Sequence, residues 1–226
     1  MINIVKSQPA PACLAIEKAK ANGTYRCGDV LSRLVIDFFN KCYLCGEHAP
    51  SSLNIEHFLA HHQGKNRNLL FDWLNLFLVC SHCNNTKLAK AIYDHILNCT
   101  DPNDLVTEWI EFHINPYPME HAIITARKDD VRVQNTVALL DEIYKGKTLN
   151  KELEANNIRR KIVDEICSFQ KLLLGFYELG MSQEEKDDIE RQIRRKISLE
   201  SPFTAFKLWI IKRNAYLMTE FGSLLP

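Results

Sequence analysis

The chain has 226 residues, of which 46% are hydrophobic and 25% charged. This composition is typical of a folded globular protein and argues against disorder. No apolar run reaches the roughly 18 residues that cross a bilayer, and the first residues lack the apolar core of a signal peptide. We therefore expect a cytoplasmic protein with no membrane partner.

The charge is balanced, with 28 basic and 28 acidic side chains, so the formal net charge is zero. Residues 1–100 hold 10 basic and 7 acidic side chains, and the remainder holds 18 and 21. Affinity for a phosphate backbone grows with the number of phosphates neutralised, so this balance predicts a weak grip on polyanions. Either the basic side chains cluster locally, or a partner protein supplies most of the affinity for the polyanion.

Hydrophobic periodicity and turn residues divide the chain into two parts. In chain order we expect helices over 13–21 and 29–40, a strand over 53–58, a short helical piece over 69–74, a strand over 76–79 and a helix over 84–91. Beyond residue 100 we expect a helix start at Asp101-Pro102, strands over 109–114 and 122–127, and helices over 136–144, 150–178, from Ser182 and from Ser201. The sequence thus predicts a predominantly helical α+β fold, with one domain over 1–100 and a mainly helical region over 101–226. The apolar stripes of this region are expected to be core, with a partner-binding face on the last helix as the alternative.

Two cysteine couplets, Cys42-Tyr43-Leu44-Cys45 and Cys80-Ser81-His82-Cys83, have the spacing of zinc knuckles. Four thiolates complete the tetrahedron of a structural zinc ion and leave no open position for water. Buried pairs or redox disulfides are the alternative. We expect His82 to be exposed, and Cys13, Cys27, Cys99 and Cys167 to be small buried apolar side chains.

Polar residues of a second kind lie among these couplets: Ile55-Glu56-His57, then Leu74-Asn75-Leu76, then Asn84-Asn85-Thr86-Lys87 directly after Cys83. Over residues 42–91 the chain resembles the zinc-bearing branch of the HNH endonuclease family, as an HNN variant in which asparagine replaces the third histidine. The resemblance implies a ββα-metal core with a four-cysteine zinc site and hydrolysis of phosphodiester bonds in DNA.

The resemblance also implies a role for each residue. His57 would be the general base, for which an imidazole pKa of about 6.5 is suitable. Glu56 and Asn84 would ligate a catalytic Mg²⁺ or Mn²⁺ ion, with a plain helix N-cap as the alternative for Asn84. Asn75 would tie the loop between the strands and hold His57 in line. Lys87 would contact phosphate, unless it is an ordinary solvated charge.

The flanking segments Ile4-Val5-Lys6, 136–140, 159–169 and Ser201-Pro202-Phe203 resemble the PtuB family, the HNH nuclease of Septu-type and retron-linked anti-phage systems. This resemblance implies a PtuA-like ATPase as partner, and a homo-oligomer remains open. The alternative is a catalytically inactive, zinc-bearing nucleic-acid-binding or scaffold subunit.

Overall fold

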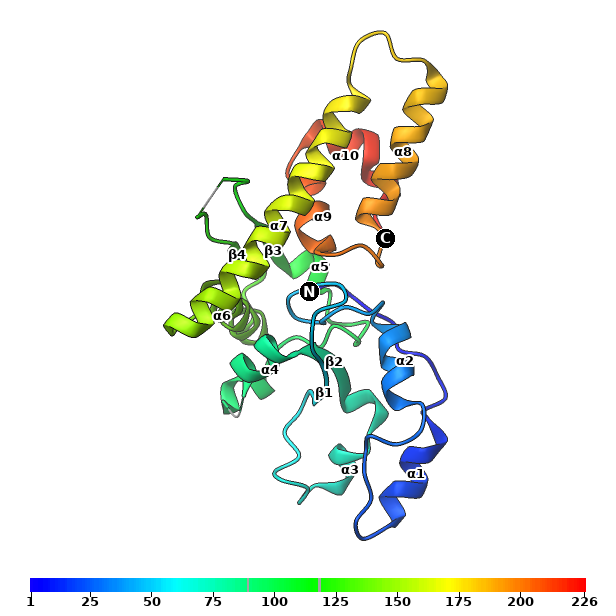
Figure 1. The fold of residues 1–226 in the computed structure, drawn as a ribbon, viewed down its shortest axis with the longest axis vertical. Coiled ribbons are helices and arrows are strands. Elements are labelled where there is room, and N and C mark those ends of the chain that lie inside the picture. Colours follow the sequence, from blue (N-terminus) through cyan, green and yellow to red (C-terminus); the bar gives the residue numbers. More distant parts are fainter. Residues whose placement is uncertain (89, 118) are drawn as a thin grey trace.

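The structure, a computed structural model, describes residues 1–88, 90–117 and 119–226. Helices make up about 51% of the chain and accompany two small antiparallel sheets. This confirms the expected α+β, predominantly helical class. In Figure 1 the first ninety residues form the lower part of the molecule, and the last four α-helices form the upper part.

The lower part contains the elements on which the candidate site is built. In chain order these are α1 (Ala12–Ala19), α2 (Val30–Asp37), β1 (Leu53–His57), α3 (Arg67–Leu70), η1 (Trp73–Asn75), β2 (Leu76–Cys80), α4 (Ser81–Lys87) and η2 (Ala91–Asp94). Strands β1 and β2 pair antiparallel, with Leu53 opposite Cys80 and His57 opposite Leu76. The predicted order of strand, loop, strand and helix is therefore present.

Helix α4 differs from its predicted range at both ends. It begins at Ser81, three residues early, because Cys80 already has extended backbone and serves as the N-cap. It ends at Lys87, where Leu88 turns away with ψ of 122°. Of the predicted remainder, Ala89 lies outside the described residues and Ala91 begins η2.

The second half is mainly helical, as expected. Its elements are α5 (Val106–Trp109), β3 (Ile110–His113), β4 (Ile123–Ala126), α6 (Val131–Lys145), α7 (Leu149–Phe176), α8 (Gln183–Ile197), α9 (Thr204–Lys212), α10 (Ala215–Phe221) and η3 (Gly222–Leu224). The capping box of Ser182 and Glu185 is confirmed at the start of α8. Helix α6 begins five residues earlier than predicted, because the Asp130 carboxylate caps it by accepting from Arg132 N.

Two expected helices are corrected. No helix begins at Asp101-Pro102, where the chain turns before α5. The single final helix is instead two, because the Asn214 side chain accepts hydrogen bonds from the N–H groups of Tyr216 and Leu217 and starts α10. Asparagine favours such caps over helix interiors.

In the described part of the chain, the hydrophobic core consists of two clusters of buried residues. The larger cluster of buried residues runs from Met1 to Trp209 and includes β1 and β2 together with β3 and α6. A smaller cluster joins the end of α7 to α8, α9 and α10. One core thus supports both halves of the chain, and the second lies in the upper helices of Figure 1.

The cysteines outside the couplets are not all alike, which corrects the expectation of four buried apolar side chains. Cys13 and Cys27 form a disulfide across the start of α1 and the turn before α2. Cys99 is free and buried, whereas Cys167 is free and half-buried. The disulfide restrains the segment between α1 and α2, which contacts the candidate site.

Candidate functional site

Four cysteine side chains meet below the first turn of α4. Cys42 and Cys45 come from the loop between α2 and β1, Cys80 ends β2, and Cys83 lies in α4. All four are buried, and their Sγ atoms lie within 4.8 Å of one another. A tetrahedron with Zn–S bonds of about 2.3 Å has S–S edges of about 3.8 Å, and the Cys45 and Cys80 sulfurs are 3.9 Å apart. The cluster could therefore hold a metal ion such as zinc.

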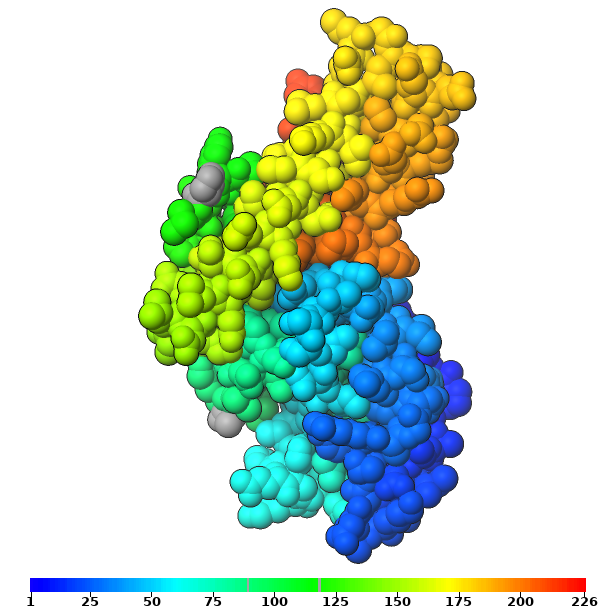
Figure 2. Space-filling view, in the orientation of Figure 1, coloured from blue at the N-terminus to red at the C-terminus, as the bar shows by residue number. Residues whose placement is uncertain are grey.

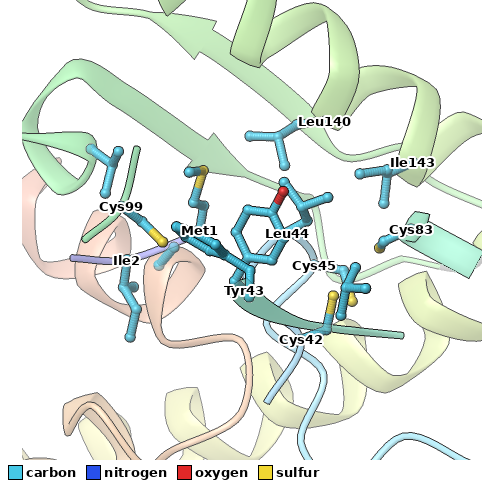
Figure 3. Packing of buried hydrophobic residues seen from close by; sticks show 14 of the residues in the cluster. Met1, Ile2, Cys42, Tyr43, Leu44, Cys45, Cys83, Cys99, Leu140 and Ile143 are labelled. Carbon is cyan, nitrogen blue, oxygen red and sulfur yellow. The ribbon is translucent and has the colours of Figure 1, made fainter. Parts of the chain in front are cut away.

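The first couplet folds into a tight turn closed by backbone hydrogen bonds. Gly46 N donates to Cys42 O at 2.9 Å, and Cys42 N donates to Glu47 O at 3.0 Å. Gly46 has a φ of 74°, which a residue without Cβ adopts at little cost. Tyr43 N donates to Leu78 O and anchors the turn on β2. Figure 3 shows Cys42, Cys45 and Cys83 at one side of the buried cluster, with Cys99 apart from them.

His82 is not exposed, contrary to the sequence-based expectation. Its side chain is only 8% exposed, and Nδ1 lies 2.6 Å from Glu154 Oε2. Its Nε2 lies 2.8 Å from Ile143 O. The residue inside the second couplet therefore links α4 to α6 and α7.

His57 lies at the end of β1 in a partly enclosed position. Its ring contacts the ring of Tyr25 edge-on at 4.6 Å between centroids and that of His61 at 4.3 Å. Its Nε2 lies 3.0 Å from Leu70 O. A carbonyl oxygen can only accept a hydrogen bond, so Nε2 carries the proton and Nδ1 presents its lone pair.

Burial of the ring lowers the pKa of His57 to about 4, although its hydrogen bond to Leu70 opposes the shift. Desolvation disfavours the imidazolium form. The nearby His61 also lowers the pKa of His57. His57 is therefore neutral at physiological pH and can accept a proton, but a pKa of about 4 makes it a weaker base than the ordinary imidazole that the sequence led us to expect.

Asn75 fixes the chain that follows His57. Its Oδ1 accepts from Leu59 N at 2.7 Å, and its Nδ2 donates to Leu59 O and Leu69 O at 3.1 and 3.0 Å. Its backbone carbonyl accepts from Phe58 N. Asn75 is 3% exposed, and its hydrogen bonds join two parts of the loop between β1 and β2.

Lys6 binds backbone carbonyls on both sides of Asn75 in the chain, contacts that the sequence did not indicate. Its buried ammonium donates hydrogen bonds to the carbonyl of Trp73, the first residue of η1, and to that of Leu76, the first residue of β2. Burial lowers the pKa of Lys6 to about 7, against the opposing effect of Asp37. The N-terminal segment thereby helps to fix the η1 turn.

Glu56 and Lys87 form a buried pair on the other side of β1. Each side chain is 7% exposed, and Lys87 Nζ lies 2.5 Å from Glu56 Oε1 and 2.8 Å from Phe58 O. Burial raises the pKa of Glu56, and Lys87 opposes the shift. Lys87 is therefore turned inward and presents no exposed ammonium for phosphate, contrary to the expectation from its position in the motif.

The pair leaves one carboxylate oxygen free. Glu56 Oε1 is bonded to Lys87 and lies 3.4 Å from the Tyr43 hydroxyl. Glu56 Oε2 is buried and has no hydrogen-bond partner among the described residues. Such an orphaned anionic oxygen is rare in folded proteins and is the part of Glu56 that a cation could use.

Asn84 is half-buried in α4, directly after Cys83. It is the fourth residue of the helix, so the alternative of an N-cap role is wrong, and Cys80 holds that position. Helix α4 packs against both β1 and β2. Asn84 and His57 thus belong to the same strand–strand–helix unit, in which the cysteine cluster fixes the start of the helix.

No protein-family model matches the chain, and a search of curated proteins finds no match. Among the described residues, no helix is both long enough and apolar enough to span a membrane.

Replacing Cys83 by Ser should remove one of four metal ligands. We expect zinc content to fall well below one ion per chain and the free energy of unfolding to fall by several kcal/mol, because metal binding contributes directly to folding. Cys99→Ser, a buried cysteine outside the cluster, is the control. Elemental analysis and urea denaturation measure both quantities, and equal zinc in the two variants would contradict the site.

Replacing Lys87 by Met should leave the Glu56 carboxylate buried without its partner, at a cost of about 3–5 kcal/mol in the free energy of unfolding. The double variant Glu56→Gln, Lys87→Met should recover much of this loss. Lys90→Met, which removes an exposed lysine, should cost at most about 1 kcal/mol. Denaturant unfolding tests the series; a Lys87 variant as stable as the Lys90 variant would mean that Lys87 faces solvent.

Replacing Tyr25 by Ala should expose the His57 ring and raise its pKa from about 4 toward the ordinary value of about 6.5. The direction is upward because desolvation by burial is the main cause of the depression. NMR titration of the imidazole in Mg²⁺-free protein measures it, with Tyr216→Ala, a distant exposed tyrosine, as control. An unchanged pKa in the Tyr25 variant would show that other groups enclose the ring.

Proposed function

We propose that the chain is a divalent-metal-dependent endonuclease of the HNH type that hydrolyses phosphodiester bonds in DNA. The observation that carries the proposal is the state of His57, a neutral imidazole whose Nε2 faces a carbonyl and whose Nδ1 is left as the proton acceptor. The sequence motif and the order β1, β2, α4 support the same assignment.

His57 is the proposed general base. Its Nδ1 would take a proton from the water that attacks the phosphorus atom, while the Leu70 carbonyl holds Nε2–H and stabilises the imidazolium that forms. Asn75 holds the chain after β1 and so limits movement of His57. The residue therefore acts from a fixed position, which proton transfer requires.

The resemblance assigns Glu56 and Asn84 as ligands of the catalytic ion. For Glu56 the available atom is Oε2, which lies on the interior face of β1, opposite to His57. Carboxylate and amide oxygens, together with water, suit Mg²⁺ or Mn²⁺, and the unpartnered Oε2 of Glu56 fits this use. When bound, the ion would neutralise charge on the scissile phosphate and the departing oxygen. Lys87 would then orient the Glu56 carboxylate through Oε1 rather than contact phosphate.

The resemblance of the flanks to PtuB further suggests that the chain is the nuclease subunit of an anti-phage complex with a PtuA-like ATPase. The net charge of zero supports a shared capture of substrate. The C-terminal helices α7–α10 enclose their own core and are large enough to present a partner surface.

Replacing His57 by Ala tests the function. We expect cleavage of plasmid DNA with Mg²⁺ or Mn²⁺ to fall at least about 100-fold, because a positioned base contributes about 10²–10⁴-fold. His121→Ala, an exposed histidine elsewhere, should cleave like the wild type. Thermal melting and zinc content show that both variants are folded.

Two outcomes would decide against the proposal. Equal cleavage by the His57 variant would exclude this base. Absence of cleavage by the wild type, alone and with its ATPase partner and with either metal, would favour the alternative of an inactive zinc-bearing binding or scaffold subunit.

A further inference from the structure

Two segments beside His57 hold a local excess of positive charge. Residues 12–28 and 59–68 together contain five basic side chains and one acidic side chain, which leaves 23 basic and 27 acidic elsewhere. Figure 2 shows these segments as the blue and cyan regions at the lower end of the molecule. A neutral protein thus has a local basic surface at one end.

Arg67 joins the two segments. Its guanidinium donates to the carbonyls of Lys18 and Lys20, each at 2.7 Å. These carbonyls lie at the end of α1, where the helix dipole is negative. The disulfide of Cys13 and Cys27 closes the same segment from the other side. The basic side chains are therefore displayed on a restrained framework.

Residues of both segments contact His57, the proposed general base. Arg26 lies over the Tyr25 ring at 5.5 Å, and Tyr25 contacts the His57 ring. On the other side, His61 contacts His57, and the next residues line an open hollow formed by His62, Lys65, Asn66, Arg67 and Asn68. No residue lining this hollow is acidic.

Two carboxylates that contact these segments are already engaged. Glu17 accepts from Lys20 Nζ and Thr24 N, and Asp94 accepts from Ala60 N. Lys18, Arg26 and Lys65 are exposed. They therefore remain able to bind an anionic ligand.

We infer that the surface formed by Lys18, Arg26, His62 and Lys65, on the two segments that Arg67 joins, binds the phosphate backbone of the nucleic acid and places it beside His57. This inference rests on the proposed function. It replaces Lys87, which is buried, as the source of phosphate contact. Repeated phosphates match cations spread over two segments, and the restrained backbone lowers the ordering cost of binding.

The test measures DNA binding without cleavage. Labelled duplex DNA is titrated with the His57→Ala protein, without added Mg²⁺, at several salt concentrations. In this background the triple change Lys18→Gln, Arg26→Gln, Lys65→Gln should weaken binding at least about tenfold and reduce the slope of log K against log salt by about 2–3, since each phosphate contact contributes about 0.9. The control change Lys171→Gln, Arg194→Gln, Arg195→Gln removes three exposed cations from α7 and α8 and should leave both quantities unchanged.

Unchanged binding and slope in the first triple variant, with normal thermal melting, would overturn the inference. Unchanged DNA binding with loss of association with the ATPase would also overturn it and assign the surface to an acidic protein partner. Loss of DNA binding in a protein whose wild type never cleaves would support the surface and refute the catalytic proposal. If the protein with an intact His57 cleaves DNA, the same triple change made in that protein should raise KM for DNA and leave kcat unchanged.

Discussion

The buried cluster of four cysteines is the constraint on which the rest of the structure depends. It fixes the loop after α2, the end of β2 and the start of α4 at one point. Residues from later helices bind the backbone of the first couplet. Tyr144 donates its hydroxyl proton to Cys45 O at 3.1 Å, and Phe203 N donates to Gly46 O at 2.9 Å. The cluster therefore connects the small β1–β2 sheet to helices that come much later in the chain.

The two faces of β1 divide the polar residues into separate environments. Because side chains alternate along a strand, Glu56 lies in the interior with Lys87 and Tyr43, while His57 lies against Tyr25, His61 and Leu70 O. Burial acts on both groups in the same sense, favouring the neutral form. The buried ammonium of Lys87 opposes the rise in the pKa of Glu56. The groups that shift the pKa of His57 include no carboxylate that would oppose its fall. A proton acceptor and a charged pair can therefore occupy adjacent positions.

Two buried lysines have a structural role, because each binds backbone carbonyls from distant parts of the chain. Lys6 binds the carbonyls around η1, and Lys41 binds the carbonyls of Leu199 and Ser201 at the start of the last helices. Burial lowers the pKa of each to about 7. A long aliphatic stem allows lysine to cross apolar surface and still donate hydrogen bonds to buried carbonyls. These buried lysines are therefore not available to bind a polyanion.

The sequence by itself determined most of the elements and the metal-binding pattern. Periodicity found the strands and the long α7, and residue spacing found the capping box at Ser182, because these depend on neighbours two to four residues apart. The spacing of Cys42, Cys45, Cys80 and Cys83 predicted their convergence. Only the tertiary structure decided that Lys87 turns inward, that His82 is bonded to α6 and α7, and that Tyr25 covers His57. Lys87 is 31 residues from Glu56, His82 is 61 residues from Ile143, and Tyr25 is 32 residues from His57. Burial and pairing at such separations depend on tertiary packing, which no local sequence pattern encodes.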